Sequence, residues 1–192
     1  MYSYGIAQRP LGRTVRNLLL ITIGLFILEV LLDPRSLDSR FVGPLAQWFG
    51  LSWGDVRQGM IWQPVTYMFL HGGVMHLFMN MLALFFLGRE LEDTLGMKRF
   101  LQLYLGCGLL GGLGWLLLSG AAGHVCVGAS GAVFGIIGAF AALFPHRKLT
   151  LLLFFVIPVT TSARTLAIVF GVGTLLMLRI GGGATKDVRD KA

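Results

Sequence analysis

Charged residues are scarce in this sequence. Lys, Arg, Asp and Glu together make up 13% of its 192 residues, whereas soluble domains carry about 25%. Hydrophobic residues reach 55%, and the mean hydropathy is +0.76. This composition argues against a soluble globular domain and is typical of an integral membrane protein.

Cysteine and acidic residues are also few. The two cysteines, Cys107 and Cys126, lie in or beside apolar runs without metal-ligand spacing. We interpret them as packing residues and expect neither a metal site nor a cofactor. Nine acidic residues leave a net charge of +7, but the basic residues stand at the ends of apolar runs, where they orient spans and meet anionic lipid. The charge therefore indicates a lipid bilayer as partner and no nucleic acid.

Five apolar runs predict an all-α, polytopic transmembrane bundle of about five spans, because only helices and closed barrels satisfy their backbone inside lipid. The runs cover residues 17–32, 65–88, 100–119, 128–144 and 164–180. We expect a basic cytoplasmic N-terminus over residues 1–16, a membrane domain over 17–180 and a polar tail over 181–192. No small-residue cleavage site follows the first run, so it is expected to stay in the mature chain.

The connections between the runs set the expected orientation. The N-terminus, the charged stretch 89–99 and the basic cluster 146–148 fall on one side, which satisfies the positive-inside rule. We therefore expect a multi-pass protein of a bacterial plasma (inner) membrane with a cytoplasmic N-terminus. The stretch 33–64 holds Trp48, Trp53 and Trp62, as is typical of a membrane interface. Residues 149–157 are apolar but too short to cross.

Two polar sets interrupt the apolar runs. Ser130 opens the fourth run within Gly128-Ala129-Ser130-Gly131. Taken alone, a serine at that position is more often a helix cap than a nucleophile. His76 and Asn80 lie four residues apart and so share one helix face, pointing to the bundle interior as interhelical glue or as a functional pair. If the sets meet, the pair could donate to an oxyanion formed at Ser130.

Four short motifs together resemble the rhomboid family of intramembrane serine proteases. They are Trp62-Gln63, His71-x-x-x-x-His76-x-x-x-Asn80, Gly88-x-x-x-Glu92-x-x-x-Gly96 and Gly128-x-Ser130-Gly131. The resemblance runs from about Trp62 to the fifth run. It implies a serine endopeptidase that cleaves single-span membrane proteins by acyl transfer to the residue matching Ser130.

The same resemblance implies roles for further residues. His76 and Asn80 match the oxyanion-hole residues, and Glu92 matches an acidic residue that ties the inner ends of the spans together. Trp62 lies in the family's outer-leaflet loop, and Phe134 matches an aromatic residue that packs against the family's catalytic histidine. The expected supporting set is Gly128, Gly131, His71, Trp62, Glu92 and Phe134.

Two departures from the family pattern limit this expectation. Gln63 stands where the family often has arginine, so an ion-pairing role is lost. The family's general base is a histidine on a sixth span, and none of the four histidines here lies beyond His146. We expect a truncated chain with little or no activity, since rescue by His76 or His124 is disfavoured. The alternative is a non-catalytic rhomboid-like protein that binds transmembrane segments; a transporter or channel is less favoured.

Overall fold

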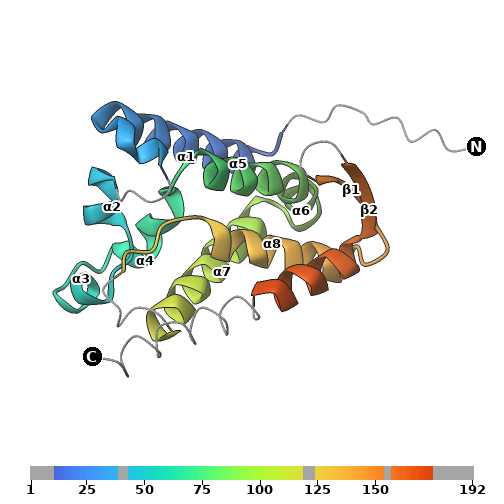
Figure 1. Cartoon of the computed structure of the whole chain (residues 1–192). Coiled ribbons are helices and arrows are strands. Elements are labelled where there is room, and N and C mark those ends of the chain that lie inside the picture. Colours follow the sequence, from blue (N-terminus) through green and yellow to red (C-terminus); the bar gives the residue numbers. More distant parts are fainter. Residues whose placement is uncertain (1–10, 39–42, 119–123, 154–156, 175–192) are drawn as a thin grey trace, which may run out of the picture. The chain divides into compact units, whose positions relative to one another are not determined.

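The computed structural model describes residues 11–38, 43–118, 124–153 and 157–174. They fall into two compact units, Met1–Ile136 and Ile137–Ala192. Figure 1 shows that the described residues are mostly helical, with a pair of strands towards the C-terminal end. Residues 1–10 of the expected N-terminal segment 1–16, and the whole expected tail 181–192, lie outside the described residues.

The longest apolar helices lie in the first unit. Among the described residues, three stretches are long and apolar enough to cross a membrane: Arg13–Leu32, Val74–Leu95 and Met97–Leu118. The expected fourth and fifth runs form shorter apolar helices, Ser130–Leu143 and Ala163–Thr174. The prediction of a helical membrane bundle is therefore confirmed. The elements up to the serine helix are α1 (Arg13–Leu32), η1 (Pro34–Leu37), α2 (Pro44–Phe49), α3 (Trp53–Arg57), α4 (Gln63–Thr66), η2 (Tyr67–Phe69), α5 (Val74–Ala83), η3 (Leu84–Gly88), α6 (Arg89–Leu95), α7 (Met97–Leu118) and α8 (Ser130–Leu143).

Helix α1 begins earlier than its apolar run suggests. The buried carboxylate of Glu92 accepts hydrogen bonds from the backbone N–H groups of Thr14 (2.8 Å) and Val15 (2.9 Å). These are among the N–H groups that a helix start leaves without partners. Gly12 comes so close to this carboxylate that an added Cβ would collide with it. Glu92 thus extends the helix into the stretch expected to be a polar N-terminus.

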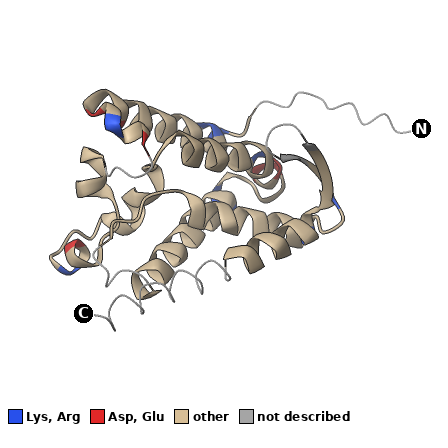
Figure 2. Ribbon diagram, viewed as in Figure 1, with Lys and Arg blue, Asp and Glu red and all other residues tan. Residues whose placement is uncertain are grey.

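The charged stretch 89–99 is not the connection that the sequence suggested. Helices α5, η3 and α6 run on continuously, and Gly96, with φ +77°, is the break before α7. Arg89–Leu95 form α6 as the continuation of the apolar helix, and Lys98 and Arg99 lie in the first turn of α7. Figure 2 shows that α8 and most of α7 carry no charge.

A π-helical turn, η3, interrupts the Val74–Leu95 helix. In a regular α-helix two residues twelve apart differ by about 120° in direction, since each residue turns about 100°. A π turn takes up roughly one extra residue, so Asn80 and Glu92 can face the same way. Both are buried, with 5% and 6% exposure. The π turn therefore lets Asn80 and Glu92 point to the same side of this helix.

Gln63 organises the long loop between α1 and α5. Its fully buried amide accepts the Ser52 N–H at 3.0 Å and donates to the Trp48 carbonyl at 3.4 Å and to Asp55 Oδ2 at 3.3 Å. The Trp62 indole also donates to the Trp48 carbonyl, at 3.0 Å. A neutral amide thus connects the short helices α2, α3 and α4, without the ion pair expected of an arginine.

The second unit contains a β-hairpin that the sequence did not predict. Strands β1 (Lys148–Leu153) and β2 (Ile157–Ser162) pair antiparallel, with Thr150 opposite Thr160. The apolar stretch 149–157 supplies most of β1. β-branched residues such as Thr150, Val159 and Thr160 occur in the two strands and favour this conformation. The described part of the fifth apolar run follows as Ala163–Thr174.

Candidate active site

Ser130 is the first residue of α8, and the loop before it requires glycine at position 128. Gly128 has φ +127°, a conformation that L side chains rarely adopt. A Cβ there would lie 2.5 Å from His76 Cε1 and 2.8 Å from Nε2. The histidine ring therefore lies directly against the backbone of the serine loop, and both backbone and space exclude a side chain at Gly128.

Backbone hydrogen bonds hold this loop to distant parts of the first unit. Leu51 and Cys126 exchange two N–H···O bonds of 2.8 Å each, and the Gly128 N–H donates to the Tyr67 carbonyl at 2.9 Å. The partners lie more than 60 residues earlier in the chain. The position of Ser130 is thus fixed by the tryptophan-containing loop as well as by its own helix.

His71 joins the two polar sets that the sequence singled out. Its ring is 3% exposed and meets the His76 ring edge to face, with centroids 5.1 Å apart and an interplanar angle of 65°. Its Nε2 accepts the Ala129 N–H at 3.4 Å. The motif around His71 and His76 and the motif around Ser130 therefore meet in the folded chain.

These contacts fix the protonation of His71. Because Nε2 accepts a hydrogen bond, the proton of the neutral ring is on Nδ1, which has no hydrogen-bond partner among the described residues. Burial, with the His76 ring as a second cause, lowers the pKa of His71 to about 3. The Phe69 backbone opposes the shift but makes no full hydrogen bond to the ring. His71 is therefore a neutral acceptor at physiological pH.

Asn80 lies one turn after His76 and is buried. Its Nδ2 donates to the His76 carbonyl at 2.9 Å, within the helix. An amide nitrogen carries two hydrogens, so one remains for a second acceptor. The half-buried His76 ring and this amide lie on the same helix face. Their oxyanion role stays a prediction.

The remaining predicted residues are distributed over the fold. Gly131 packs against α7, where an added Cβ would lie 3.2 Å from Gly111 Cα. Phe134 is one turn beyond Ser130 and 39% exposed. Trp62 donates to the Trp48 carbonyl in the long loop between α1 and α5. Glu92 accepts the backbone N–H groups at the start of α1. His124 is exposed in the loop before Ser130. No group of three or more His, Cys, Asp or Glu side chains among the described residues could hold a metal ion.

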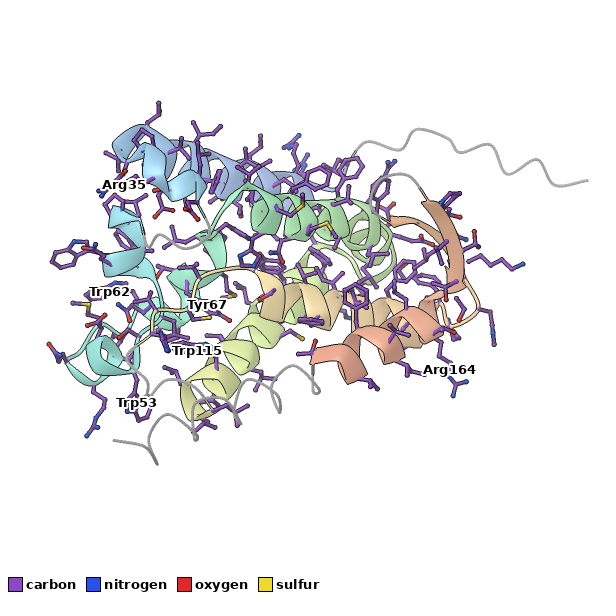
Figure 3. All side chains as sticks on the ribbon, viewed as in Figure 1. Arg35, Trp53, Trp62, Tyr67, Trp115 and Arg164 are labelled. Carbon is purple, nitrogen blue, oxygen red and sulfur yellow. The ribbon has the colours of Figure 1, made fainter. Side chains whose placement is uncertain are left out.

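Tyr67 is the residue that sequence patterns missed. It is 2% exposed, its carbonyl accepts the Gly128 N–H, and its hydroxyl donates to the Gly108 carbonyl of α7 at 2.6 Å. Figure 3 shows it in the interior of the first unit. An aromatic residue in an apolar run gives no local signal for such long-range contacts.

The chain is similar to known proteins over most of its length, including the segments that form this site. A family model described as "Rhomboid domain" matches residues 58–184. "RHOMBOID-like protein 4" of Arabidopsis thaliana is 36% identical over 162 residues, which are 81% of this chain and 38% of the relative. "Putative rhomboid protease YdcA" of Bacillus subtilis is 37% identical over 93 residues, 48% of this chain and 46% of the relative. "Rhomboid protease GluP" of the same bacterium is 39% identical over 98 residues, 50% of this chain and 18% of the relative. The chain thus spans less than half the length of each.

Proposed function

The chain belongs to the rhomboid family of integral membrane proteins, and we propose on this basis that it has the site of an intramembrane serine endopeptidase. Ser130 is the nucleophile, and the substrates are single-span membrane proteins. The observation that carries the proposal is the packing of His71 and His76 against the Gly128–Ser130 loop. Two relatives bear the name rhomboid protease, which also supports it.

The proposed reaction is acyl transfer to Ser130. Its Oγ attacks the carbonyl carbon of the scissile peptide bond, a base accepts the hydroxyl proton, and the amine leaves with a proton. The Ser130 N–H belongs to the first turn of α8, so it has no helical partner and points with the positive end of the helix dipole. In this proposal it stabilises the oxyanion together with the His76 ring and the second Asn80 N–H.

The proposed site has no histidine that is available as a general base for Ser130. In the 192-residue chain, His71 already accepts the Ala129 N–H, and His76 has the oxyanion role. His124 is exposed in its loop. We therefore propose that this chain by itself reacts slowly, with a residual rate from binding and oxyanion stabilisation, as when triad members are removed from soluble serine proteases.

A fluorophosphonate probe tests the nucleophile in the purified chain. We expect slow labelling that is absent in Ser130→Ala and unchanged in Ser52→Ala, a control serine outside the site. Labelling that persists in Ser130→Ala would disprove the assignment. Fast labelling that depends on Ser130 would uphold the nucleophile but contradict the proposed low activity.

A non-catalytic protein that binds transmembrane segments is the second candidate. It is favoured by the observation that His71 Nε2, which faces the serine loop, already accepts the Ala129 N–H and so is occupied as a proton acceptor. Photo-crosslinking to a single-span peptide separates the two, since a binder would capture the peptide equally well in the wild-type chain and in the Ser130→Ala variant and never release cleaved product. Retention of Ser130, His76 and Asn80 together favours the enzyme.

For orientation we propose a cytoplasmic N-terminus in a bacterial plasma membrane. Arg13 and Arg16 at the α1 start and Lys98 and Arg99 at the α7 start are exposed, and the positive-inside rule assigns such ends to the cytoplasm. Labelling of single cysteines in sealed vesicles, at position 13 or at position 53 of the tryptophan loop, tests it. Labelling of position 13 from the outer side would reverse the orientation.

A further inference from the structure

We propose that Tyr67 is a positioning residue that sets the location of Ser130 from both sides of the serine. This inference rests on the proposed function, because it gives the position of Ser130 a catalytic purpose. Its structural basis is a set of contacts between η2, α7 and the start of α8, all within the first unit.

The backbone of Tyr67 holds the segment before the serine. Its carbonyl accepts the N–H of Gly128 at 2.9 Å. Gly128 is two residues before Ser130 and has the positive φ that turns the chain into α8. A shift of Tyr67 therefore moves the turn that presents the serine.

The side chain of Tyr67 reaches the other side of the serine. A Cβ on Gly131 would lie 3.4 Å from the Tyr67 hydroxyl oxygen and 3.2 Å from Gly111 Cα. On α7, a Cβ on Gly112 would lie 3.0 Å from Tyr67 Cε1. Tyr67 thus packs where the backbones of α7 and α8 approach each other, at Gly111 and Gly131. Gly131 is the residue directly after the proposed nucleophile. We call this place the α7–α8 corner.

The Tyr67 hydroxyl is hydrogen-bonded to the backbone of α7 in this position. The hydroxyl donates to the Gly108 carbonyl at 2.6 Å. Burial, followed by the nearby Cys126, raises the pKa of Tyr67 to about 12, against a weaker opposing effect of the Gly112 backbone. The hydroxyl therefore remains a donor at every working pH, so this hydrogen bond does not depend on pH.

Tyr104 provides a matched control. It lies in α7, is fully buried like Tyr67, and its hydroxyl has no hydrogen-bond partner among the described residues. Tyr67→Phe and Tyr104→Phe remove the same atom from equally buried rings, but only the first removes a contact beside Ser130. In Tyr67→Phe the Gly108 carbonyl keeps its helical N–H partner, so the variant is expected to fold.

The test combines fluorophosphonate labelling kinetics with hydrogen exchange of residues 128–132. For Tyr67→Phe we expect the maximal labelling rate to fall about tenfold, equivalent to about 1.4 kcal/mol in the barrier, with the half-saturating probe concentration unchanged. Exchange in 128–132 should rise while the melting temperature stays close to that of Tyr104→Phe. Equal labelling and exchange in the two variants would overturn the proposal.

Two further outcomes are separated by the same design. If the wild-type chain is never labelled, the proposed function fails, and hydrogen exchange alone decides whether Tyr67 holds the serine loop. If Tyr67→Phe does not fold, Gly131→Ala perturbs the α7–α8 corner from the α8 side. A folded Gly131→Ala chain with normal exchange and normal labelling would then contradict the proposal.

Discussion

The rings of His71 and His76 meet edge to face with their centroids 5.1 Å apart. His71 accepts the Ala129 N–H, and His76 lies against Gly128. The two histidines therefore form a continuous contact from the α5 helix to the serine loop. Through this contact the motif around His71 and His76 and the motif around Ser130 form one site.

The Gly128 position should tolerate no side chain. Gly128→Ala forces a Cβ into the His76 ring and holds a non-glycine residue at φ +127°, at a cost on the order of 1–3 kcal/mol. We expect a lower melting temperature and loss of Ser130 labelling. The control is Gly114→Ala in α7, where the added Cβ meets open space and alanine favours the helix. Equal melting temperatures in the two variants would contradict the packing described here.

Acid should destabilise the chain through His71. Its pKa is about 3 in the folded chain, against an ordinary value of 6.5, so the unfolded state binds more protons below pH 6.5. The stability that this neutral ring contributes is complete above pH 6.5 and is lost as the pH falls towards 3. Between pH 7.5 and 5 the loss is ~2 kcal/mol. Unfolding of the detergent-solubilised chain should show this loss, and His71→Gln should reduce it. An identical pH dependence in wild type and His71→Gln would refute the assignment.

Glu92 should stabilise the start of α1. Glu92→Ala removes the acceptor of the Thr14 and Val15 N–H groups, and bonds to a charged acceptor contribute about 2 kcal/mol each. We expect a lower melting temperature and faster hydrogen exchange at residues 14–16. Asp93→Asn, at the exposed neighbouring position, is the control and should change neither quantity. Unchanged exchange at 14–16 in Glu92→Ala would show that the helix start does not depend on this carboxylate.

The π turn should make one residue of the Val74–Leu95 helix dispensable. Deleting Phe86, which is 63% exposed, leaves Asn80 and Glu92 eleven residues apart, and a regular α-helix then keeps them in phase. Deleting Leu110, which is 70% exposed in the regular helix α7, rotates Gly108 relative to Gly111 and Gly112. We expect the first deletion to fold and the second to fail, as judged by size-exclusion chromatography and thermal unfolding. Failure of both deletions would contradict the role of the π turn.

The sequence predicted the parts of this fold that have a local pattern. Apolar runs marked the helices, and the spacing of His76 and Asn80 placed them on one face. The hydrogen bonds from Leu51 to Cys126 and from Gly128 to Tyr67 join residues more than 60 positions apart, and no periodicity records them. The charged stretch 89–99 looked like a loop because its helical residues are polar, and the Glu92 contact with α1 uses backbone partners that have no sequence signature.

Gln63 shows a second limit of prediction from residue types. The absence of an arginine suggested a lost interaction, yet a buried amide offers both a donor and an acceptor. Gln63 uses both, towards Trp48 and Ser52. The sequence could identify the position but not the replacement network, because that network depends on where the loop carbonyls lie.

The most direct test of the central claim is chemical rescue of Ser130. The chain is proposed to hold the nucleophile and the oxyanion donors and to need a base, and a positioned base contributes about 10²–10⁴-fold. Fluorophosphonate labelling is measured with increasing imidazole, and the modified residue is identified by mass spectrometry. We expect imidazole to raise labelling at Ser130 roughly tenfold or more, since a dissolved base recovers part of that factor, with no adduct in Ser130→Ala. Labelling at Ser130 that imidazole leaves unchanged, or an adduct on another residue, would contradict the account.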